Sequence, residues 1–314
     1  MSMGEYLKLA RITAWPASLF SFAVGFGAGA TQWTHWEDSL FGLLAVLSFF
    51  SFAFALNFYS DRDVDRYHDG RQKDIKLSEQ PLLTGEVTAR ECRAFCLFAF
   101  LLAIALGWLA GALVALLVFA ACLMGGILYS HPFVRLKGKP IGDIVCMSCL
   151  SAILFSTGYA AAWEAMPSWP MFLFFSLFSA IVYIPTVVSD YEYDSKAGVR
   201  TSAVIFGQRN LMKAMWVIYV CALPVAWLII SGPYPLGSKI FIIIACATSA
   251  IYATIGWRAL KPPRLIVPVL SRRPRQAIVS FGIIALLFLG WGLFNIFGHG
   301  HASWNPFLIP WNIS

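Results

Sequence analysis

Residues 39–65 read SLFGLLAVLSFFSFAFALNFYSDRDVD, an uncharged run that passes without a break into three aspartates. A helix needs about 20 apolar residues to cross roughly 30 Å of hydrocarbon, so the run 39–60 predicts a transmembrane helix. Acidic groups at membrane depth are costly and by default mark functional sites. The stretch therefore predicts both the fold class of the chain and the place of its chemistry.

Uncharged runs of similar length recur along the whole sequence. The 314 residues are 59% hydrophobic and 12% charged, whereas a soluble domain carries about 25% charged residues. The mean hydropathy is +0.71. We therefore expect an all-α polytopic membrane protein with nine transmembrane helices in a single domain, 1–314, and no removable signal. The expected spans lie near 12–31, 39–60, 93–109, 111–129, 142–163, 169–189, 211–231, 239–257 and 276–297.

Positive charge is distributed unevenly between the two sides of this expected bundle. All 23 Lys and Arg residues except Lys239 lie before the first span or in alternate connections. Because basic residues accumulate in cytoplasmic loops, we expect the N-terminus and the loops 61–92, 130–141, 190–210 and 258–275 to face the cytoplasm. The chain is then an integral protein of the cytoplasmic membrane. Its net charge of +7 reflects topology in a lipid bilayer and does not indicate nucleic-acid binding.

Two spans of the same orientation end in similar acidic segments. The second span runs into 60–65 (SDRDVD) and the sixth runs into 189–194 (SDYEYD), so both carry the pattern Ser-Asp-x-acid-x-Asp. A short match of this kind is typical of a degenerate internal repeat. The pattern indicates two related acidic sites at one face of the membrane.

Helical spacing selects particular residues within each acidic segment. Asn57, Asp61 and Asp65 are spaced i, i+4, i+8, which places them on one stripe that drifts about 40° per step, and Asp190 and Asp194 repeat this spacing. Like charges on one stripe destabilise a helix unless a cation lies among them. Mg²⁺ prefers carboxylate and amide oxygens and commonly bridges to phosphates. These five residues are the expected metal ligands, and the four aspartates are the expected catalytic residues.

Asp63 and Glu192 lie two residues off these stripes and point roughly 160° away, so we do not expect them to bind metal. The alternative is that both segments are solvated loops whose acids are balanced by neighbouring basic residues. The aspartates begin where the helix is still leaving the bilayer, which favours a functional site.

Basic residues in the same expected loops suit an anionic ligand. Each alone is a charge that sets topology. As a set facing two acidic segments, they indicate a highly anionic ligand such as diphosphate, which Mg²⁺ and basic side chains would neutralise together. These residues are Lys76, Arg135, Lys137, Lys139, Lys196 and Arg200.

These motifs resemble the UbiA superfamily of intramembrane prenyltransferases. The family's first signature is matched by Asn57, Asp61 and Asp65, and its second by Asp190 and Asp194. Further resemblance to family segments is found at 81–85 (PLLTG), 128–133 (LYSHPF), 135–139 and 195–201. The resemblance extends to the nine-span architecture.

The resemblance implies transfer of an isoprenyl group from a prenyl diphosphate to a lipophilic or aromatic acceptor within the membrane. Two Mg²⁺ ions held by the aspartates and Asn57 would neutralise the diphosphate and let the allylic bond ionise. The diphosphate is then expected at Lys76, Tyr129, Ser130, Arg135, Lys137, Lys196 and Arg200. The active site would face the cytoplasm.

Two other functions remain open at the level of sequence. An intramembrane terpene cyclase would use the same scaffold without an acceptor. A transporter is less favoured, because most spans lack the ionisable residues that form a path through a membrane. Arg11, at the mouth of the first span, is the candidate to contact an acidic acceptor, with a cytoplasmic anchor as its alternative role.

Overall fold

The computed structural model describes residues 3–29, 36–65, 80–234 and 236–259. Within these ranges the chain forms helices and turns, with no strand, which confirms the all-α prediction for this part of the chain. The ninth expected span, 276–297, lies outside the described residues, as does Lys76.

The described part of the chain contains twelve α-helices and three helical segments of other types. In chain order they are α1 (Met3–Leu9), α2 (Trp15–Ser18), α3 (Phe20–Gly29), α4 (Trp36–Asp65), α5 (Ala89–Leu109), α6 (Ala112–Ala121), α7 (Gly142–Trp163), α8 (Trp169–Ser189), α9 (Tyr191–Lys196), α10 (Ser202–Phe206), α11 (Gln208–Ser231) and α12 (Leu236–Ala259). Tighter or wider helical turns form η1 (Ile12–Ala14), the π-helix η3 (Cys122–Leu128) and η4 (Leu136–Gly138).

Five of these helices are long and apolar enough to cross a membrane, namely α4 over Trp36–Arg62, α5, α7, α8 and α11. Three shorter apolar helices are α3, the continuous pair α6 and η3, and Ser238–Ile251 within α12. Together they overlap the first eight expected spans. Large apolar side chains on the outer faces of α5, α6 and α11 stay exposed, including Leu116 at 63% and Trp227 at 68%. Such surfaces are covered by lipid in an integral membrane protein.

The first expected span, 12–31, differs most from a single helix. It is divided into η1, α2 and α3. Arg11 has a φ of 48°, so the chain turns before η1. Pro16 in α2 has no N–H to donate to a preceding turn, which disfavours a continuous helix through this point.

Close packing of α3 against α7 depends on two glycines. A Cβ at Gly25 would lie 1.8 Å from the Phe155 carbonyl oxygen, and one at Gly158 would lie 2.0 Å from the Phe22 carbonyl oxygen. Any side chain would therefore separate the two helices, as expected where small residues let membrane helices approach.

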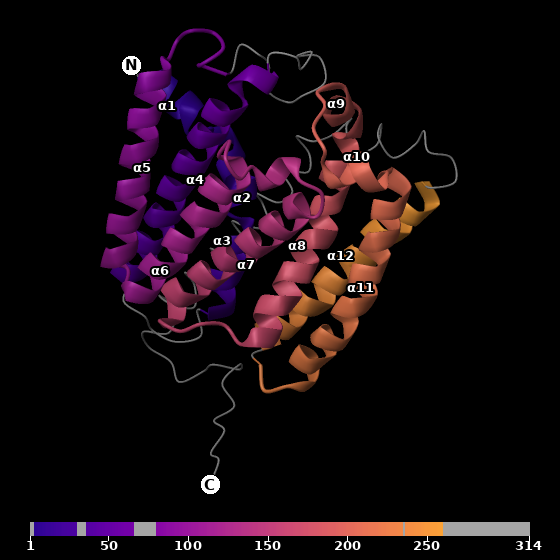
Figure 1. Cartoon of the computed structure of the whole chain (residues 1–314). Coiled ribbons are helices and arrows are strands. Elements are labelled where there is room, and N and C mark those ends of the chain that lie inside the picture. Colours follow the sequence, from indigo (N-terminus) through magenta and orange to yellow (C-terminus); the bar gives the residue numbers. More distant parts are fainter. Residues whose placement is uncertain (1–2, 30–35, 66–79, 235, 260–314) are drawn as a thin grey trace.

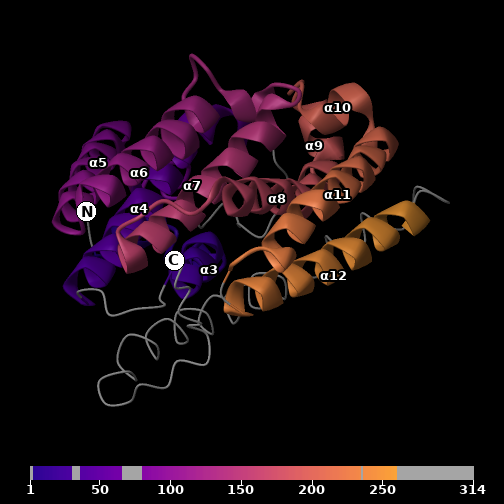
Figure 2. The same cartoon turned by 90° about the horizontal axis from the view of Figure 1, so that it is seen from below.

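The helices form one bundle, and the segments that follow the second and sixth expected spans lie at its upper end in Figure 1. Both α4 and α8 run toward that end, where α9, α10 and the connection between η3 and α7 also lie. Figure 2 shows α5 and α6 at one side, α11 and α12 at the other, and α7 between them. The ends of the second and sixth expected spans are thus brought to the same end of the molecule.

Candidate active site

The first acidic segment is the end of an unbroken helix. α4 continues through Asp65, so Asn57, Asp61 and Asp65 have the helical spacing expected from the sequence. The side chain of Asp65 lies outside the described residues. Asn57 and Asp61 are half-buried and lie one turn apart on the same face.

Asp61 is paired with two cations from the connection between η3 and α7. Its Oδ1 accepts a hydrogen bond of 3.0 Å from Arg135 Nη2, and its Oδ2 accepts one from Lys137 Nζ. The side chains of Asp61 and Lys137 are only 15% and 13% exposed. An ion pair so shielded from solvent is screened far less than one on an open surface.

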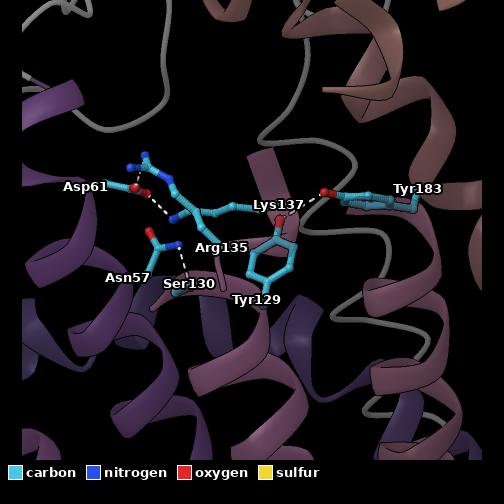
Figure 3. A network of polar contacts seen from close by, with 7 residues as sticks. All are labelled: Asn57, Asp61, Tyr129, Ser130, Arg135, Lys137 and Tyr183. Carbon is cyan, nitrogen blue, oxygen red and sulfur yellow. Dashed lines mark hydrogen bonds and ion pairs between the residues drawn. The ribbon is translucent and has the colours of Figure 1, made fainter. Parts of the chain in front are cut away.

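Asn57 joins the same cluster (Figure 3). Its Nδ2 donates to Ser130 Oγ at 3.3 Å, and Ser130 is fully buried. In the opposite amide orientation, which satisfies both ends of the side chain, Nδ2 donates to Asp61 Oδ2 at 3.3 Å and Oδ1 accepts from Lys137 Nζ at 3.0 Å. The structure therefore brings Asn57, Asp61, Ser130, Arg135 and Lys137 into one polar cluster.

Two tyrosines link this cluster to α8. The hydroxyl groups of Tyr129 and Tyr183 lie 2.9 Å apart, and Lys137 Nζ lies 5.9 Å from the centre of the Tyr129 ring. Figure 3 shows Tyr183 reaching from α8 toward Tyr129. Asp190 follows Tyr183 by seven residues, which is two helical turns on the same face of α8. The pair thus connects the first acidic segment with the helix that carries the second.

A π-helix precedes Tyr129 and Ser130. η3 ends at Leu128, and a Cβ at Gly126 within it would lie 2.3 Å from the Phe52 ring of α4. The widened turn and the missing side chain let η3 approach α4 closely. π-helical turns are often found at functional sites, and this one carries the chain into Tyr129 and Ser130.

The second acidic segment spans the junction of α8 and α9. Asp190 caps α8 by donating its N–H to the Thr186 carbonyl oxygen, and the N–H of Asp194 donates to the carbonyl oxygen of Asp190 at 3.0 Å. The helical spacing of the two aspartates is therefore present. Asp194 Oδ2 accepts a hydrogen bond of 3.1 Å from Thr201 Oγ1.

The two basic residues expected beside this segment differ from those in the first. Lys196 and Arg200 are exposed, whereas Arg135 and Lys137 are half-buried. They lie within six residues of Asp194 and at the same end of the bundle. Their expected role as diphosphate ligands stays a prediction.

Arg11 lies close to the first acidic segment. Its guanidinium carbon is 5.6 Å from the centre of the Phe54 ring, and Phe54 precedes Asn57 on α4 by one turn. This placement agrees with a residue near the mouth of the site. Contact with an acceptor stays a prediction.

Sequence reasoning missed one buried carboxylate. Asp143, in the first turn of α7, is 1% exposed and accepts hydrogen bonds from the N–H and the hydroxyl group of Ser202. A lone acid just inside an expected span was the signal that could have identified it, because acids at that depth require partners. Its pairing with Ser202 could not be read from the sequence.

The donor atoms of Asn57, Asp61, Asp190 and Asp194 are of the kind that suits Mg²⁺. Carboxylate and amide oxygens are the groups that Mg²⁺ prefers. Among the described side chains, no group of three or more His, Cys, Asp and Glu is gathered closely enough to hold a metal ion. Asp61 instead holds Arg135 and Lys137. A metal ion at Asp61 would therefore share this carboxylate with Arg135 and Lys137 or take their place.

Comparison with solved structures gives the same fold. A UbiA homologue from Archaeoglobus fulgidus bound to DMAPP and Mg²⁺ is 30% identical, with a TM-score of 0.82 over 93% of this chain and 99% of that one. The same homologue bound to GPP and Mg²⁺ gives a TM-score of 0.84 at 30% identity, with the same coverage of both chains.

Curated relatives are more distant in sequence. A digeranylgeranylglyceryl phosphate synthase of Methanopyrus kandleri is 24% identical over 217 residues, which is 68% of this chain and 76% of the relative. A 4-hydroxybenzoate octaprenyltransferase of Herminiimonas arsenicoxydans is 27% identical over 165 residues, 52% of this chain and 54% of that relative. Residues 18–266 match the UbiA prenyltransferase family as a whole. With this match over most of its length, the chain belongs to the UbiA prenyltransferase family.

Proposed function

We propose that the protein transfers an isoprenyl group from a prenyl diphosphate to a lipophilic or aromatic acceptor within the membrane, in a reaction that depends on Mg²⁺. The observation that carries this proposal is the cluster of Asn57, Asp61, Ser130, Arg135 and Lys137. It combines oxygen ligands and cations at the bundle end that also holds the second acidic segment. Solved homologues with this fold are bound to DMAPP or GPP and to Mg²⁺.

The metal ligands in this proposal are Asn57, Asp61, Asp65, Asp190 and Asp194, with two Mg²⁺ ions between the two segments. When bound, Mg²⁺ supplies positive charge that stabilises diphosphate as a leaving group. The aspartates supply the negative charge of the site. In the described structure, Arg135 and Lys137 neutralise this charge at Asp61.

Arg135 and Lys137 are the central diphosphate ligands of the proposal. Both already lie beside Asp61 and donate charge-assisted hydrogen bonds to its oxygens. A bound diphosphate would offer them more negative charge than one carboxylate, so both could donate to it, and Asp61 would then be available as a metal ligand. Ser130 hydrogen-bonds Asn57 in the same cluster, and the Tyr129 ring lies 5.9 Å from Lys137 Nζ. Lys76, Lys196 and Arg200 complete the proposed set.

The proposed reaction balances as a substitution at the allylic carbon. The bond between that carbon and the diphosphate oxygen breaks, and its electron pair leaves with the diphosphate. The nucleophilic atom of the acceptor then bonds to the carbon and loses a proton. Water has to be excluded from the allylic cation, and Phe54, one turn before Asn57 on α4, is an aromatic candidate to shield it.

The test is formation of prenylated lipid by the purified full chain in detergent with a labelled prenyl diphosphate and a lipid extract as acceptor. Asp61→Ala and Asp190→Ala should each lower the rate by about 10³-fold, because each removes negative charge that organises the leaving group. Glu192→Gln is the matched control, since Glu192 is an exposed acid of α9 off the Asp190 stripe, and it should keep nearly full activity. Unchanged diphosphate release by both folded alanine variants would disprove the proposal.

The products of the same assay separate transfer from cyclisation. Transfer requires the labelled group to be found on an acceptor, and its rate should rise with acceptor concentration. A single labelled hydrocarbon formed without an acceptor would instead establish a terpene cyclase. The cytoplasmic orientation of the site can be measured in sealed right-side-out vesicles, where an added prenyl diphosphate should react only after the membrane is opened.

A further inference from the structure

Asp143 is a buried carboxylate that the proposed reaction does not use. It lies at the start of α7, and its Oδ2 accepts a hydrogen bond of 2.9 Å from Ser202 N. Its Oδ1 accepts from the Ser202 hydroxyl group and from the N–H of Ile144 at 2.8 Å. A buried carboxylate is costly unless hydrogen bonds of this kind satisfy it, so Asp143 holds Ser202 firmly.

The partner of Asp143 is the first residue of α10. The early N–H groups of a helix have no partner inside the helix and are usually satisfied by the side chain of the preceding residue. Thr201 precedes α10 and is of a suitable type, but its side chain makes no such bond. Asp143, from another helix, accepts a hydrogen bond from the N–H of Ser202, the first N–H group of α10.

The hydroxyl group of Thr201 is directed to the second acidic segment. Thr201 is 6% exposed, and its Oγ1 donates to Asp194 Oδ2 at 3.1 Å. The N–H of Val199 also donates to the carbonyl oxygen of Asp194 at 2.8 Å. A continuous chain of hydrogen bonds and neighbouring residues therefore runs from Asp143 through Ser202 and Thr201 to the Asp194 carboxylate.

The backbone is strained just before α7, close to Asp143. Ile141, two residues before Asp143, has a φ of 67°, which is rare for a β-branched residue. Its N–H donates to the Ser202 hydroxyl oxygen at 2.7 Å. Strain of this kind persists only where surrounding contacts determine the conformation. The contact here is the hydrogen bond from Ile141 to Ser202. The connection that carries Arg135 and Lys137 is therefore held at Ser202, next to Thr201, which in turn contacts Asp194.

We propose that Asp143 is a positioning residue that fixes the orientation of the Asp194 carboxylate through Ser202 and Thr201. This inference rests on the proposed function, in which Asp194 is a metal ligand. By holding the backbone and the hydroxyl group of Ser202, Asp143 fixes the position of the adjacent Thr201, whose hydroxyl group donates to Asp194. Partners that hydrogen-bond a metal ligand fix its orientation, and their loss typically lowers metal affinity by about 10- to 100-fold.

The experiment measures metal binding directly on the purified full chain in detergent. Inorganic diphosphate is kept in excess, and the thermal unfolding midpoint is followed as Mg²⁺ is added, because a ligand that binds the folded state raises this midpoint. Thr201→Val keeps the size of the side chain and removes its hydroxyl group. It should raise the half-saturating Mg²⁺ concentration by about 10-fold, whereas Thr201→Ser should stay close to wild type.

Asp143→Asn tests the remote end of the chain of contacts. It should shift the half-saturating Mg²⁺ concentration in the same direction as Thr201→Val, and the double variant should show little further shift, because both act on Asp194 through one path. If Asp143→Asn does not fold, Ser202→Ala removes the hydroxyl contact and keeps the backbone one. Ser168→Ala is the matched control, since Ser168 hydrogen-bonds Tyr234 at 2.8 Å at the other end of α8. It should lower the midpoint without altering the Mg²⁺ dependence.

The outcomes distinguish this inference from the function on which it rests. If Mg²⁺ and diphosphate raise the midpoint of wild type but not of Asp194→Asn, the metal site stands. Wild-type behaviour of Thr201→Val, or equal shifts for Thr201→Val and Thr201→Ser, would then overturn the positioning role alone. An absence of any Mg²⁺ effect on wild type would overturn the metal site and the inference together.

Discussion

The two acidic segments have similar sequences but differ in how their charge is balanced. Asp61 in the first is held by Arg135 and Lys137, which come from a connection more than 70 residues further along the chain. Asp194 in the second accepts a hydrogen bond from the neutral hydroxyl group of Thr201, seven residues away. The basic residues nearest to it, Lys196 and Arg200, are exposed. Asp61 is thus held by half-buried cations from a distant part of the chain, and Asp194 is held by a hydroxyl group that lies close to it in the sequence.

This difference indicates an order of events at the site. In the proposed function, metal binding at Asp61 would compete with Arg135 and Lys137, so it should be weak until a diphosphate draws these cations away. In the second segment, Asp194 accepts a hydrogen bond from the neutral hydroxyl group of Thr201. We therefore expect the affinity of the first segment for metal to depend strongly on the diphosphate.

The largest effect is expected from removing one of the buried cations. Lys137→Met keeps the length of the side chain and removes its charge. It should lower kcat/KM by about 10²-fold, because a charge-assisted contact to the leaving group is lost in a water-poor site. It should also strengthen Mg²⁺ binding without diphosphate, because Asp61 then has one competing cation fewer. Steady-state kinetics and thermal unfolding against Mg²⁺ concentration measure the two effects.

The opposite signs of these two effects make the result specific. A variant that was merely misfolded would lose both activity and metal binding. If Lys137→Met lost activity but bound Mg²⁺ no better than wild type, the competition between cation and metal at Asp61 would be disproved. Lys239→Met is a control, because it removes the one basic residue expected on the other face.

Much of the first segment could be predicted from the sequence. The uncharged run into Asp61 predicts a helix, and α4 indeed continues without interruption to Asp65, so the shared face of Asn57 and Asp61 followed from spacing alone. The pairing of Asp61 with Arg135 and Lys137 could not be predicted from spacing. Those residues were expected to bind diphosphate, and only the folded chain shows that they also neutralise Asp61.

Other features depended on tertiary contacts that no local pattern records. The π-helix η3 forms where Gly126 meets Phe52 of α4, and the hydroxyl pair of Tyr129 and Tyr183 joins residues 54 apart in the chain. Asp143 was overlooked because a single acid at the start of a span resembles an ordinary helix terminus. Its function depends on Ser202, 59 residues later, which sequence periodicity cannot place.

A smaller effect is expected from the exposed cations of the second segment. Lys196→Met should lower kcat/KM by only about 3- to 10-fold, because an exposed charge interacts weakly through water. The effect should shrink further as the ionic strength rises from about 0.05 to about 0.5 M, because salt in this range screens charges at a protein surface. The effect of Lys137→Met should persist at high salt. Equal losses for the two variants at every salt concentration would contradict the distinction between buried and exposed cations.

The smallest effect is expected from the contact that joins the two regions. Tyr183→Phe removes one hydroxyl group and leaves Tyr129 without its partner at 2.9 Å. A partly buried hydroxyl group without a partner costs about 1–3 kcal/mol, whereas replacing both partners can be nearly neutral. We therefore expect each single phenylalanine variant to lower kcat by about 2- to 5-fold and to lower the unfolding midpoint, with partial recovery in the double variant. Losses that simply multiply in the double variant would show that the two tyrosines act separately, and the two acidic segments would then have to be coupled through Asp143 or through the bound diphosphate.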